Sequence, residues 1–516
     1  MSSEGPHQLV CLVAQDAAPA SGTPISCLFQ CFKMFQVNVS FPSGSGETLL
    51  LPAHSKVGDL KRLAQRSLGQ GFLKLVTAEG RVLSNPEDSL EVAVEDGGYL
   101  TAVAQQVQVA ATLGAFALWC CGGNQVVTWG NADEGGDCAA VQDQLRNVLE
   151  IQGTHWAFAA ILADGSVVTW GDPKYGGDCS SVQSQLRNVQ QIQATDCAFA
   201  AILADGSVVT WGRLDNGGNS SAVQGQLRNV KQIQAAECAF AAILADASVV
   251  SWGDPDWGAD CSAVQDKLRN VQQIQATTCA FAAILADGSV VAWGDPERGG
   301  DCSAVQGQLR NVQQIQATTC AFAAILADGS VVAWGDPECG GDCSAVQLQN
   351  VQQIQATDAA FAAILGDGSV VTWGDPKCGG DCAAVQGQLR NVQQIQASSS
   401  AFAAILCGGS VVTWGDAAWG GDCSIVEDQL RNVQQIQAAG SAFAAILADG
   451  SVVSWGDPKC GGDCSAVQNQ LRNVRHIQAT RCGAFAAILA DGSLVTWGAQ
   501  AHGGDCRAVQ DQLLYL

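Results

Sequence analysis

The residues best suited to chemistry are cysteines, and most of them recur at one place in a repeated phrase. Three copies carry a second Cys four residues earlier, giving the pairs Cys339/Cys343, Cys378/Cys382 and Cys460/Cys464. Elsewhere that earlier position is another residue, such as Tyr175, Trp257, Arg298 or His502, and no second ligand pair accompanies a CxxC spacing. We therefore favour a small buried residue over a metal or redox site, and the redox state of the pairs stays open. The recurring Cys, which follow Gly-Gly-Asp or Gly-Ala-Asp, are Cys138, Cys179, Cys261, Cys302, Cys343, Cys382, Cys423, Cys464 and Cys506.

Carboxylates and histidines give no clearer chemistry. Asp178 and its equivalents supply one carboxylate in each copy, which is too few for a calcium cage and is explained by turn formation. The five His are scattered, and no Gly-rich loop with Lys is placed to bind phosphate. The sequence predicts a protein that is not an enzyme and that uses no metal and no cofactor.

These residues belong to a repeat, and a Trp-Gly pair makes its period countable. The spacing is 41 residues except for one of 39, after a deletion near Leu348, and one of 42, after the insertion of Gly483. A fixed period of this size indicates a propeller or a solenoid, in which each unit buries its apolar face against the next. The ten Trp are Trp129, Trp170, Trp211, Trp252, Trp293, Trp334, Trp373, Trp414, Trp455 and Trp497.

Each copy reads as strands and turns. "VQQIQAT" alternates as a strand, and "AFAAIL" and "SVVTWG" read as a hairpin with Asp-Gly at its tip in seven copies. Asp-Gly predicts a two-residue turn, because Gly supplies the positive φ. A turn, "GDPKYGGD", and a short helix, "CSSVQSQLR" with Val182 and Leu186 on one face, complete the copy. The fold class is therefore mainly β, with ten repeats of about 41 residues.

The order of residues in "FAAILADGSVVTWGDPKYGGD" resembles the repeats of the regulator-of-chromosome-condensation family, over residues 107–516. The resemblance implies propeller blades, with three departures: Ala198 stands where the family has His, the loop ends in Gly-Gly-Asp, and the period is short for the family. Ten copies leave a wide closed ring, a ring with a remainder or an open superhelical array as alternatives. The degenerate first copy, "VQVAATLGAFALWCCGGNQVVTWG", slightly favours an array with ends.

The chain before the repeats divides into a flexible leader, 1–34, and a small domain, 35–106. Two strand-like runs, a helix with Val57, Leu60 and Leu68 on one face, and two further strands give the order ββαββ. Ser55 is placed to cap the helix. With the segments "LKLVTAEGRVL" and "DSLEVAVEDGGYLTAVA", this domain resembles ubiquitin-like β-grasp domains.

That resemblance implies a built-in domain and not a conjugated modifier, because Gly97-Gly98 precedes the last strand instead of ending the domain. It also implies a candidate recognition patch at Phe41, Val76 and Val103. The alternative, in which Val76 and Val103 are only strand residues, stays open, as does recognition of the domain by ubiquitin-binding modules.

The net charge of the chain limits the classes of partner that we expect. The formal net charge is −24, and about −21 of it lies after residue 106. This field repels phosphate backbones and anionic lipid, so we expect no nucleic acid and no membrane as partners, and proteins with basic surfaces instead. The N-terminus lacks the pattern of a signal peptide and no apolar run is long enough to span a bilayer. We expect a cytoplasmic protein, with the nucleus as an alternative, and mostly reduced thiols.

The copies differ most in two turns, and an invariant frame with variable tips is typical of a binding scaffold. One variable tip precedes the hairpin ("THW", "TDC", "AEC", "SSS", "TRC") and the other follows Trp-Gly. The two resemblances together imply a non-catalytic protein-protein interaction scaffold, with ubiquitin-pathway components as partners, related to HECT-type ligases that carry the same repeats. The alternatives are a guanine-nucleotide exchange factor for a small GTPase and an ultraviolet-B photoreceptor-like protein. The candidate contact residues after Trp-Gly are Lys174, Tyr175, Asp256, Trp257, Glu297, Arg298, Trp419 and His502.

Overall fold

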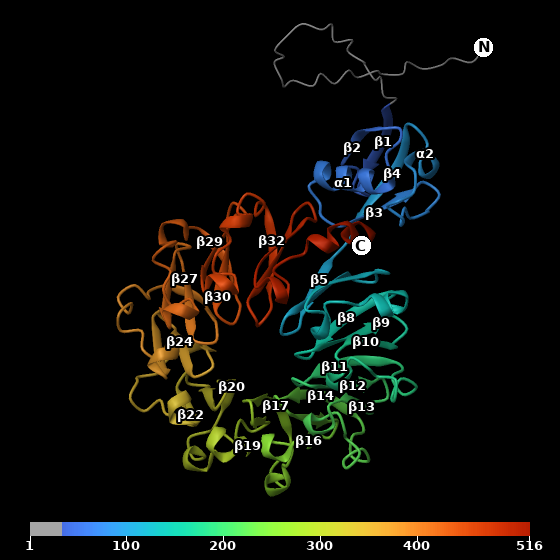
Figure 1. The fold of residues 1–516 in the computed structure, drawn as a ribbon. Coiled ribbons are helices and arrows are strands. Elements are labelled where there is room, and N and C mark those ends of the chain that lie inside the picture. The colour runs from blue at the N-terminus through green and yellow to red at the C-terminus, as the bar shows by residue number, and fades with distance from the viewer. Residues whose placement is uncertain (1–33) are drawn as a thin grey trace, which may run out of the picture. The chain divides into compact units, whose positions relative to one another are not determined.

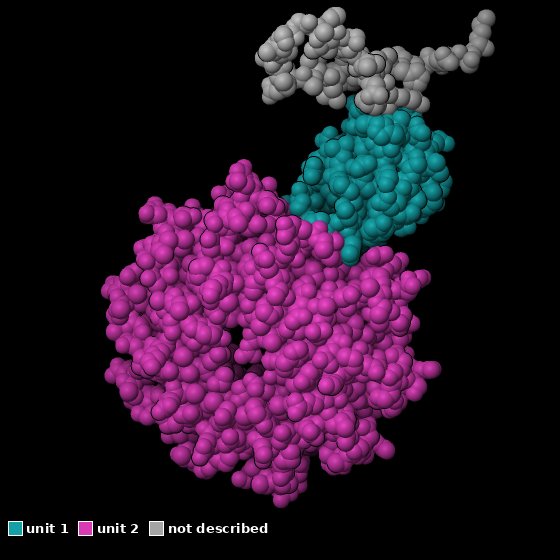
Figure 2. Space-filling model, in the orientation of Figure 1, with its two compact units in different colours: residues 1–106, 490–493, 510–516 teal, residues 107–489, 494–509 magenta. Residues whose placement is uncertain are grey.

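A computed structural model describes residues 34–516 of the chain, so the predicted leader lies outside the described residues except for Met34. The chain forms two compact units, coloured separately in Figure 2. Unit 1 holds the residues up to 106 together with 490–493 and 510–516, and unit 2 holds 107–489 and 494–509.

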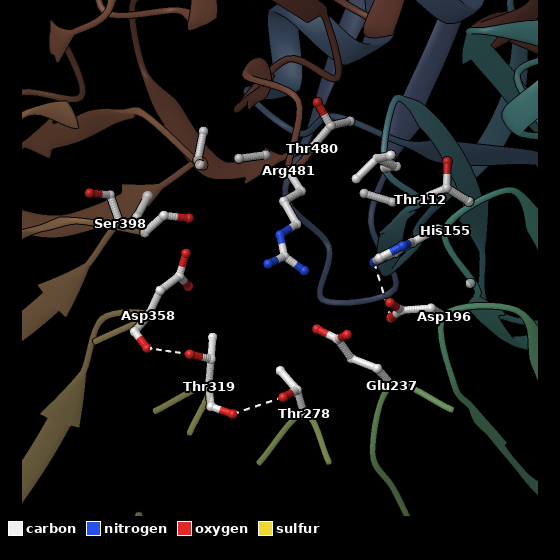
Figure 3. Close-up of a pocket in the computed structure, with 18 of the residues that line it drawn as sticks. Thr112, His155, Asp196, Glu237, Thr278, Thr319, Asp358, Ser398, Thr480 and Arg481 are labelled. Atoms are coloured by element: carbon white, nitrogen blue, oxygen red, sulfur yellow. Dashed lines mark hydrogen bonds and ion pairs between the residues drawn. The ribbon is translucent and has the colours of Figure 1, made fainter. Parts of the chain in front are cut away.

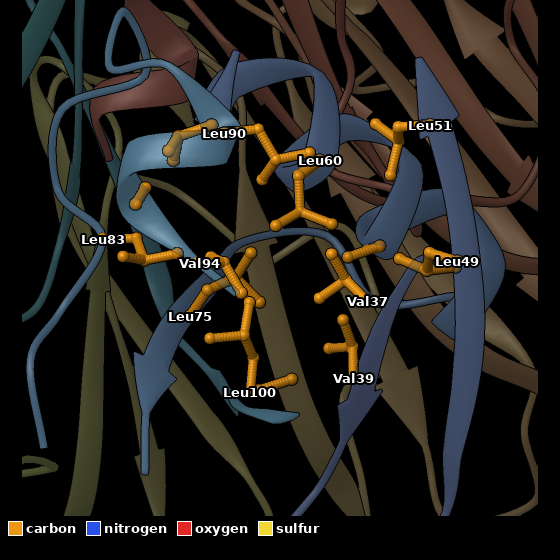
Figure 4. Packing of buried hydrophobic residues seen from close by; sticks show 14 of the residues in the cluster. Val37, Val39, Leu49, Leu51, Leu60, Leu75, Leu83, Leu90, Val94 and Leu100 are labelled. Atoms are coloured by element: carbon orange, nitrogen blue, oxygen red, sulfur yellow. The ribbon is translucent and has the colours of Figure 1, made fainter. Parts of the chain in front are cut away.

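Unit 1 is the predicted β-grasp fold. Strands β1 (Met34–Ser40), β2 (Gly46–Pro52), β3 (Leu73–Thr77) and β4 (Gly98–Ala104) form a sheet in the order β2-β1-β4-β3, with β1 and β4 parallel. Helix α1 (Val57–Leu68) packs on one face of the sheet, and α2 (Leu90–Ala93) precedes β4. Figure 4 shows the core between sheet and helices, in which residues such as Val37, Leu60 and Leu100 are almost fully buried.

The helix cap differs from the sequence prediction. Ser55 is buried and its carbonyl accepts the N–H of Leu90, so this residue is drawn into the packing against α2. Lys56 precedes the first helical residue instead, and its N–H donates to Asp59 Oδ2 at 2.9 Å. A carboxylate three residues into the helix therefore closes the N-terminus.

Unit 2 consists of ten three-stranded antiparallel sheets arranged in a ring (Figure 1). The space-filling view shows an opening at the centre of this unit (Figure 2). The first strands of successive repeats lie next to one another. They are β5 (Val107–Ala111), β8 (Val148–Gly153), β11 (Val189–Ala194), β14 (Val230–Ala235), β17 (Val271–Ala276), β20 (Val312–Ala317), β23 (Val351–Ala356), β26 (Val392–Ala397), β29 (Val433–Ala438) and β32 (Val474–Ala479).

Each sheet continues with a middle and a third strand, which form the predicted hairpin. The middle strands are β6 (Ala115–Cys120), β9 (Ala157–Leu162), β12 (Ala198–Leu203), β15 (Ala239–Leu244), β18 (Ala280–Leu285), β21 (Ala321–Leu326), β24 (Ala360–Leu365), β27 (Ala401–Leu406), β30 (Ala442–Leu447) and β33 (Ala484–Leu489). The third strands are β7 (Val126–Gly130), β10 (Val167–Gly171), β13 (Val208–Gly212), β16 (Val249–Gly253), β19 (Val290–Gly294), β22 (Val331–Gly335), β25 (Val370–Gly374), β28 (Val411–Gly415), β31 (Val452–Gly456) and β34 (Leu494–Gly498).

Short 3-10 turns follow the third strands. They are η1 (Ala132–Glu134), η3 (Pro173–Tyr175), η4 (Leu214–Asn216), η5 (Pro255–Trp257), η7 (Pro296–Arg298), η9 (Pro337–Cys339), η10 (Pro376–Cys378), η11 (Ala417–Trp419), η13 (Pro458–Cys460) and η15 (Gln500–His502). The segment predicted as a short helix is a turn in every copy and contains 3-10 pieces in some: η2 (Ala139–Gln144), η6 (Ser262–Val264), η8 (Ser303–Val305), η12 (Glu427–Gln429), η14 (Ser465–Val467) and η16 (Arg507–Tyr515). The segment is too short for an α-helix, because it must turn back to the next first strand.

Both faces of each sheet are buried, which explains the continuous apolar run "AFAAIL". Along β9, Ala157, Ala159 and Ile161 point to one face and pack against Phe199 and Trp211 of the next sheet. Small Ala side chains opposite large aromatic rings let neighbouring sheets interdigitate. Stacking, and not the isolated hairpin, therefore stabilises each repeat.

The repeated Trp joins neighbouring sheets. Trp170 stacks on Phe158 of its own sheet with ring centroids 5.3 Å apart, and its Nε1 donates to the carbonyl of Gly135, 35 residues earlier, at 3.0 Å. All ten Trp of the Trp-Gly pairs make this bond to the preceding repeat, and Trp129 makes it to Gly503 at 3.1 Å. The first and last repeats are therefore joined, and the expected preference for an array with ends is wrong.

The hairpin tip is also longer than predicted. Leu162 N–H bonds to Ser166 O and Gly165 N–H to Leu162 O, so three residues form the loop and not two. Gly165 has φ +77°, and an added Cβ would lie 2.6 Å from Cα of Asn188. Gly is needed both for the positive φ and for close approach of the next strand. No helix among residues 34–516 is long and apolar enough to cross a membrane.

Candidate functional site

Ten residues surround one end of the central opening of unit 2, one from each turn between first and middle strands. We call them the inner ring: Leu113, His155, Asp196, Glu237, Thr278, Thr319, Asp358, Ser399, Gly440 and Arg481. Their backbones are linked from repeat to repeat, as when His155 N–H donates to Asp196 O at 2.9 Å and Asp358 N–H to Ser399 O at 2.9 Å. Across the seam between the last and first repeats, Cys482 N–H donates to Leu113 O at 3.0 Å. These backbone groups are engaged with one another, so the side chains determine what the ring can bind.

The inner ring encloses a polar cavity of about 790 Å³. Figure 3 shows the Arg481 guanidinium reaching toward its middle, with the carboxylates of Glu237 and Asp358 also directed inward. His155 Nε2 lies 3.2 Å from Asp196 Oδ1. Carboxylates, hydroxyls and one guanidinium give this cavity a mixed but mainly acidic lining.

Burial shifts the titration of three of these groups. Burial, and to a smaller extent the Arg481 charge, lowers the pKa of His155 to about 4, so its imidazole is neutral at pH 7. Burial and then the Glu237 charge raise the pKa of Asp196 to about 7, against an opposing effect of Arg481. Burial also raises the pKa of Asp358, again opposed by Arg481. Asp196 is therefore the group of these three whose pKa is raised to near neutral pH.

The residue before each inner-ring position holds the turn in place. Thr154 Oγ1 accepts the N–H of Ala157 at 2.9 Å and donates to Tyr175 O at 3.2 Å, which ties the turn to the 3-10 turn of the same repeat. Thr or Ser makes equivalent bonds in seven other repeats. Ala236 and Ala439 replace it in the other two repeats and cannot form these bonds.

The Thr bonds bring a second set of residues to the same end of unit 2. This outer ring consists of the last residue of each 3-10 turn: Glu134, Tyr175, Asn216, Trp257, Arg298, Cys339, Cys378, Trp419, Cys460 and His502. Tyr175 packs on Trp156, which follows His155 of the inner ring, with centroids 4.4 Å apart. Five predicted contact residues, Tyr175, Trp257, Arg298, Trp419 and His502, thus belong to one ring.

The other three predicted contact residues lie one position earlier in their turns. Lys174, Asp256 and Glu297 are exposed, and their N–H groups donate to the Asp that begins each turn, as Lys174 N–H does to Asp172 Oδ1 at 2.8 Å. The inner ring was absent from the predicted contact residues, although the variable strings "THW", "TDC" and "TRC" contain it. Variation before the hairpin was the signal that could have found it.

The recurring cysteines are structural. Cys179 is 4% exposed, its thiol donates to Gln183 Oε1 at 2.9 Å, and burial raises its pKa. Ser220 occupies the same place in the third copy and donates to Gln224 Oε1 at 2.8 Å, so a small donor is what the site requires. The cysteines of the sequence pairs Cys339/Cys343, Cys378/Cys382 and Cys460/Cys464 are free thiols.

The predicted patch of unit 1 divides between two environments. Val76 and Val103 lie on the sheet face away from the core, and they are diagonal neighbours because Val76 pairs with Thr101 and Lys74 with Val103. Phe41 lies in the turn after β1 and packs partly against the core. The sheet thus brings Val76 and Val103 together, and Phe41 has a separate packing role.

Burial determines the reactivity of two thiols beside the inner ring. Two thiols next to the inner ring, Cys197 and Cys238, are poor nucleophiles, since burial raises the pKa of Cys197 to about 11 and that of Cys238 to about 12. His155 is paired with Asp196 instead of with a hydroxyl or thiol. The fold and site together define a closed ring of ten β-sheets with variable side chains around one end.

No family model matches the chain, and no curated protein matches it. Among solved structures it is similar to Prp20p of Saccharomyces cerevisiae, whose structure is described with its binding to Gsp1p and histones, at 15% identity over 69% of this chain and 83% of that chain, TM-score 0.32. A second structure is yeast RCC1 (Prp20) bound to Kap60, at 14% identity over 51% of this chain and 79% of that chain, TM-score 0.30.

The ubiquitin-like region has a separate counterpart. It is the N-terminal ubiquitin-like domain in the 4931431F19Rik protein, at 21% identity over 18% of this chain and 93% of that chain, TM-score 0.13. The identities and TM-scores are too low for any of these likenesses to carry partners over to this chain. The assignment of a mainly β repeat fold depends on the strands and sheets themselves.

Proposed function

We propose that this chain is a non-catalytic scaffold that binds a protein at the inner and outer rings of unit 2. The observation that carries the proposal is the distribution of variation. The ten repeats keep the same sheet residues, whereas the residues that differ converge on one end of the ring, around a cavity of about 790 Å³. A constant frame that positions variable side chains is how repeat proteins present a binding surface.

The charge of the site favours a basic partner surface. Asp196, Glu237 and Asp358 direct carboxyl groups to the cavity, and the repeat region as a whole is strongly acidic. Complementary charge accelerates encounter and selects among partners. Lys or Arg side chains are therefore the groups that we expect the partner to place at the inner ring.

The test compares two full-length variants with the same change in charge. The ring variant carries Asp196→Asn, Glu237→Gln and Asp358→Asn, and the control carries Asp→Asn at three hairpin tips at the opposite end of the sheets, Asp164, Asp287 and Asp328. Proteins captured by each variant are quantified by mass spectrometry. We expect partners that the wild type and the control retain and the ring variant loses. Equal capture by both variants, loss in the control alone, or no specific partner of the wild type would contradict the proposal.

The finer role that we propose is that of an adaptor in the ubiquitin pathway, with unit 1 recognised by ubiquitin-binding modules. Its support is the β-grasp topology with Val76 and Val103 side by side on the open sheet face. Full-length protein is assayed for binding to a panel of such modules, with Val103→Lys as the disruptive change and Glu47→Lys, on the edge strand β2, as the control. Binding that Val103→Lys does not weaken, or no binding at all, would refute this role.

The alternatives find less support. Ultraviolet sensing is not favoured, because the ten Trp of the Trp-Gly pairs are buried and each donates to a Gly carbonyl. Nucleotide exchange predicts that the purified chain accelerates nucleotide release from a small GTPase. Acceleration in that assay would replace the scaffold proposal.

A further inference from the structure

A second series of cysteines lies between the two rings, one position after the inner ring. Cys279 and Cys320 belong to this series, and the outer ring adds Cys339. Within one repeat, the second series and the outer ring place two thiols in adjacent turns. Cys343 is the nearest cysteine to Cys339 in the sequence, but Cys320 is the cysteine in the turn that is bonded to the turn of Cys339.

Cys320 and Cys339 are held together by the backbone of their repeat. Asp336 N–H donates to Cys320 O at 3.0 Å, and Thr318 Oγ1 donates to Cys339 O at 3.1 Å. These bonds fix the two turns against each other, and in the next repeat the same two positions bring Cys378 Sγ to 3.7 Å from Ser400 Oγ. Both residues are partly exposed. Cys343 faces the other way, because its thiol donates to Val331 O at 3.8 Å.

A positive charge stands next to this pair. Arg298 Nη1 lies 3.8 Å from Cys279 Sγ, and its charge also interacts with Cys320. A guanidinium beside a thiol stabilises the thiolate, which is the form that reacts with peroxides. Burial, and then the neighbouring Cys320, raise the pKa of Cys339 to about 12. The Cys339 thiol also lies 3.9 Å from the Asp336 carboxylate, which favours the protonated form. We therefore assign Cys320 as the attacking sulfur of the pair and Cys339 as the thiol that reacts second.

We propose that Cys320 and Cys339 form a dithiol modification site that hydrogen peroxide oxidises to an intramolecular disulfide. Cys320 attacks the peroxide O–O bond and becomes a sulfenic acid with release of one water. The Cys339 sulfur then displaces the hydroxyl group from Cys320, which leaves as a second water and takes the Cys339 proton. Two thiols and one peroxide give one disulfide and two waters, and the disulfide links the inner turn to the outer ring.

The chain contains its own control for this geometry. In the next repeat, Cys378 faces Ser400, with Sγ and Oγ 3.7 Å apart, so the second position carries a hydroxyl instead of a thiol. Cys378 is partly exposed like Cys339, but it has no thiol opposite. It also shows that Ser fits the position of Cys320, so Cys320→Ser preserves the fold.

The experiment treats full-length wild type, Cys320→Ser and Ser400→Cys with hydrogen peroxide, blocks the remaining thiols and maps disulfides by mass spectrometry. Cleavage after Lys, Arg and Glu separates residues 311–338 from 339–377, so the expected bond joins two peptides. We expect Cys339 of the wild type to be oxidised on the order of tenfold faster than Cys378, since a second thiol traps the sulfenic acid.

Each variant has a distinct expected outcome. Cys320→Ser slows the oxidation of Cys339 to the rate of Cys378, and Ser400→Cys creates a second disulfide, between positions 378 and 400. A disulfide between Cys339 and Cys343, equal oxidation rates of Cys339 and Cys378 in the wild type, or an unchanged Cys339 rate in Cys320→Ser would each overturn the proposal.

Discussion

Replacing Trp129 by Phe tests whether the ring is closed. Trp129 Nε1 donates to Gly503 O at 3.1 Å across the seam, and Trp293 Nε1 donates to Gly258 O at the same distance inside the ring. Phe removes the donor and leaves a buried carbonyl unpaired, which costs about 1 to 3 kcal/mol. Loss of the larger ring against Phe116 adds about 1 to 2 kcal/mol for the void. Because the environments match, we expect Trp129→Phe and Trp293→Phe to lower the free energy of unfolding by the same amount, about 2 to 5 kcal/mol.

The assay is denaturant unfolding of the full-length variants, followed by hydrogen exchange read at peptides on both sides of each replaced Trp. In a closed ring, both variants lower the unfolding midpoint equally and accelerate exchange in the repeats on each side. An open array predicts that Trp129→Phe leaves the repeat containing Gly503 unaffected, while Trp293→Phe still destabilises both of its neighbours. That asymmetry would refute the closed ring.

Two further predictions concern single repeats. Ala247 has φ +62° where other repeats have Gly, which strains the backbone. Ala247→Gly should therefore raise the free energy of unfolding by about 0.5 to 1 kcal/mol and slow hydrogen exchange at its hairpin. The reverse change in another repeat, Gly288→Ala, should lower the free energy of unfolding, and a change of the same sign in both variants would contradict the strain. Ala236→Thr restores the missing bond to the outer ring and should stabilise by about 1 kcal/mol by denaturant titration, with Ala235→Thr, one residue earlier, as a control that should give no such gain.

The pH prediction concerns Asp196. Because the pKa of Asp196 is raised in the folded protein, this group contributes stability below its unfolded pKa of 3.8, and that contribution is lost as the pH rises toward 7. Asp196→Asn should therefore stabilise the protein at pH 8 and change little at pH 4, in unfolding curves at the two pH values. The contribution of His155 to stability has the opposite pH dependence, because it is lost as the pH falls from 6.5 to about 4. His155 is present in both the wild type and Asp196→Asn, so this contribution is common to the two proteins. A larger stabilisation at pH 4 would refute the assignment.

Local patterns predicted the sheets because each strand carries its own signal. The alternation in "VQQIQAT", the Asp-Gly tips and the Trp-Gly pair all correspond to observed strands and turns. The predictions of the helix cap and of the hairpin loop were wrong at residues that contact a residue far away in the sequence. Ser55 accepts a bond from Leu90 instead of capping its helix, and the tip at Gly165 gains a residue because the loop also approaches Asn188.

Closure of the ring and the site at its end could not be predicted from one repeat. Whether ten units close depends on the small rotation between stacked sheets, which no single residue specifies. The insertion of Gly483 affects the seam between the last and first repeats. There the N–H of Cys482, and not that of Arg481, donates to Leu113 O of the first repeat. Likewise, His155 and Asp196 are 41 residues apart in sequence, and only stacking brings their side chains within 3.2 Å.

Variation in exposed turns can result from neutral change after duplication as well as from selection for binding. The first strands of the repeats help to separate these two explanations. The residue after the first Val of these strands, such as Gln190 or Gln272, is exposed and has no turn geometry to satisfy, yet it is Gln in six of the nine copies after the first. The inner ring holds eight residue types among ten positions. Drift alone should vary both sets to a similar extent. The concentration of differences at the cavity therefore favours selection for what the ring contacts.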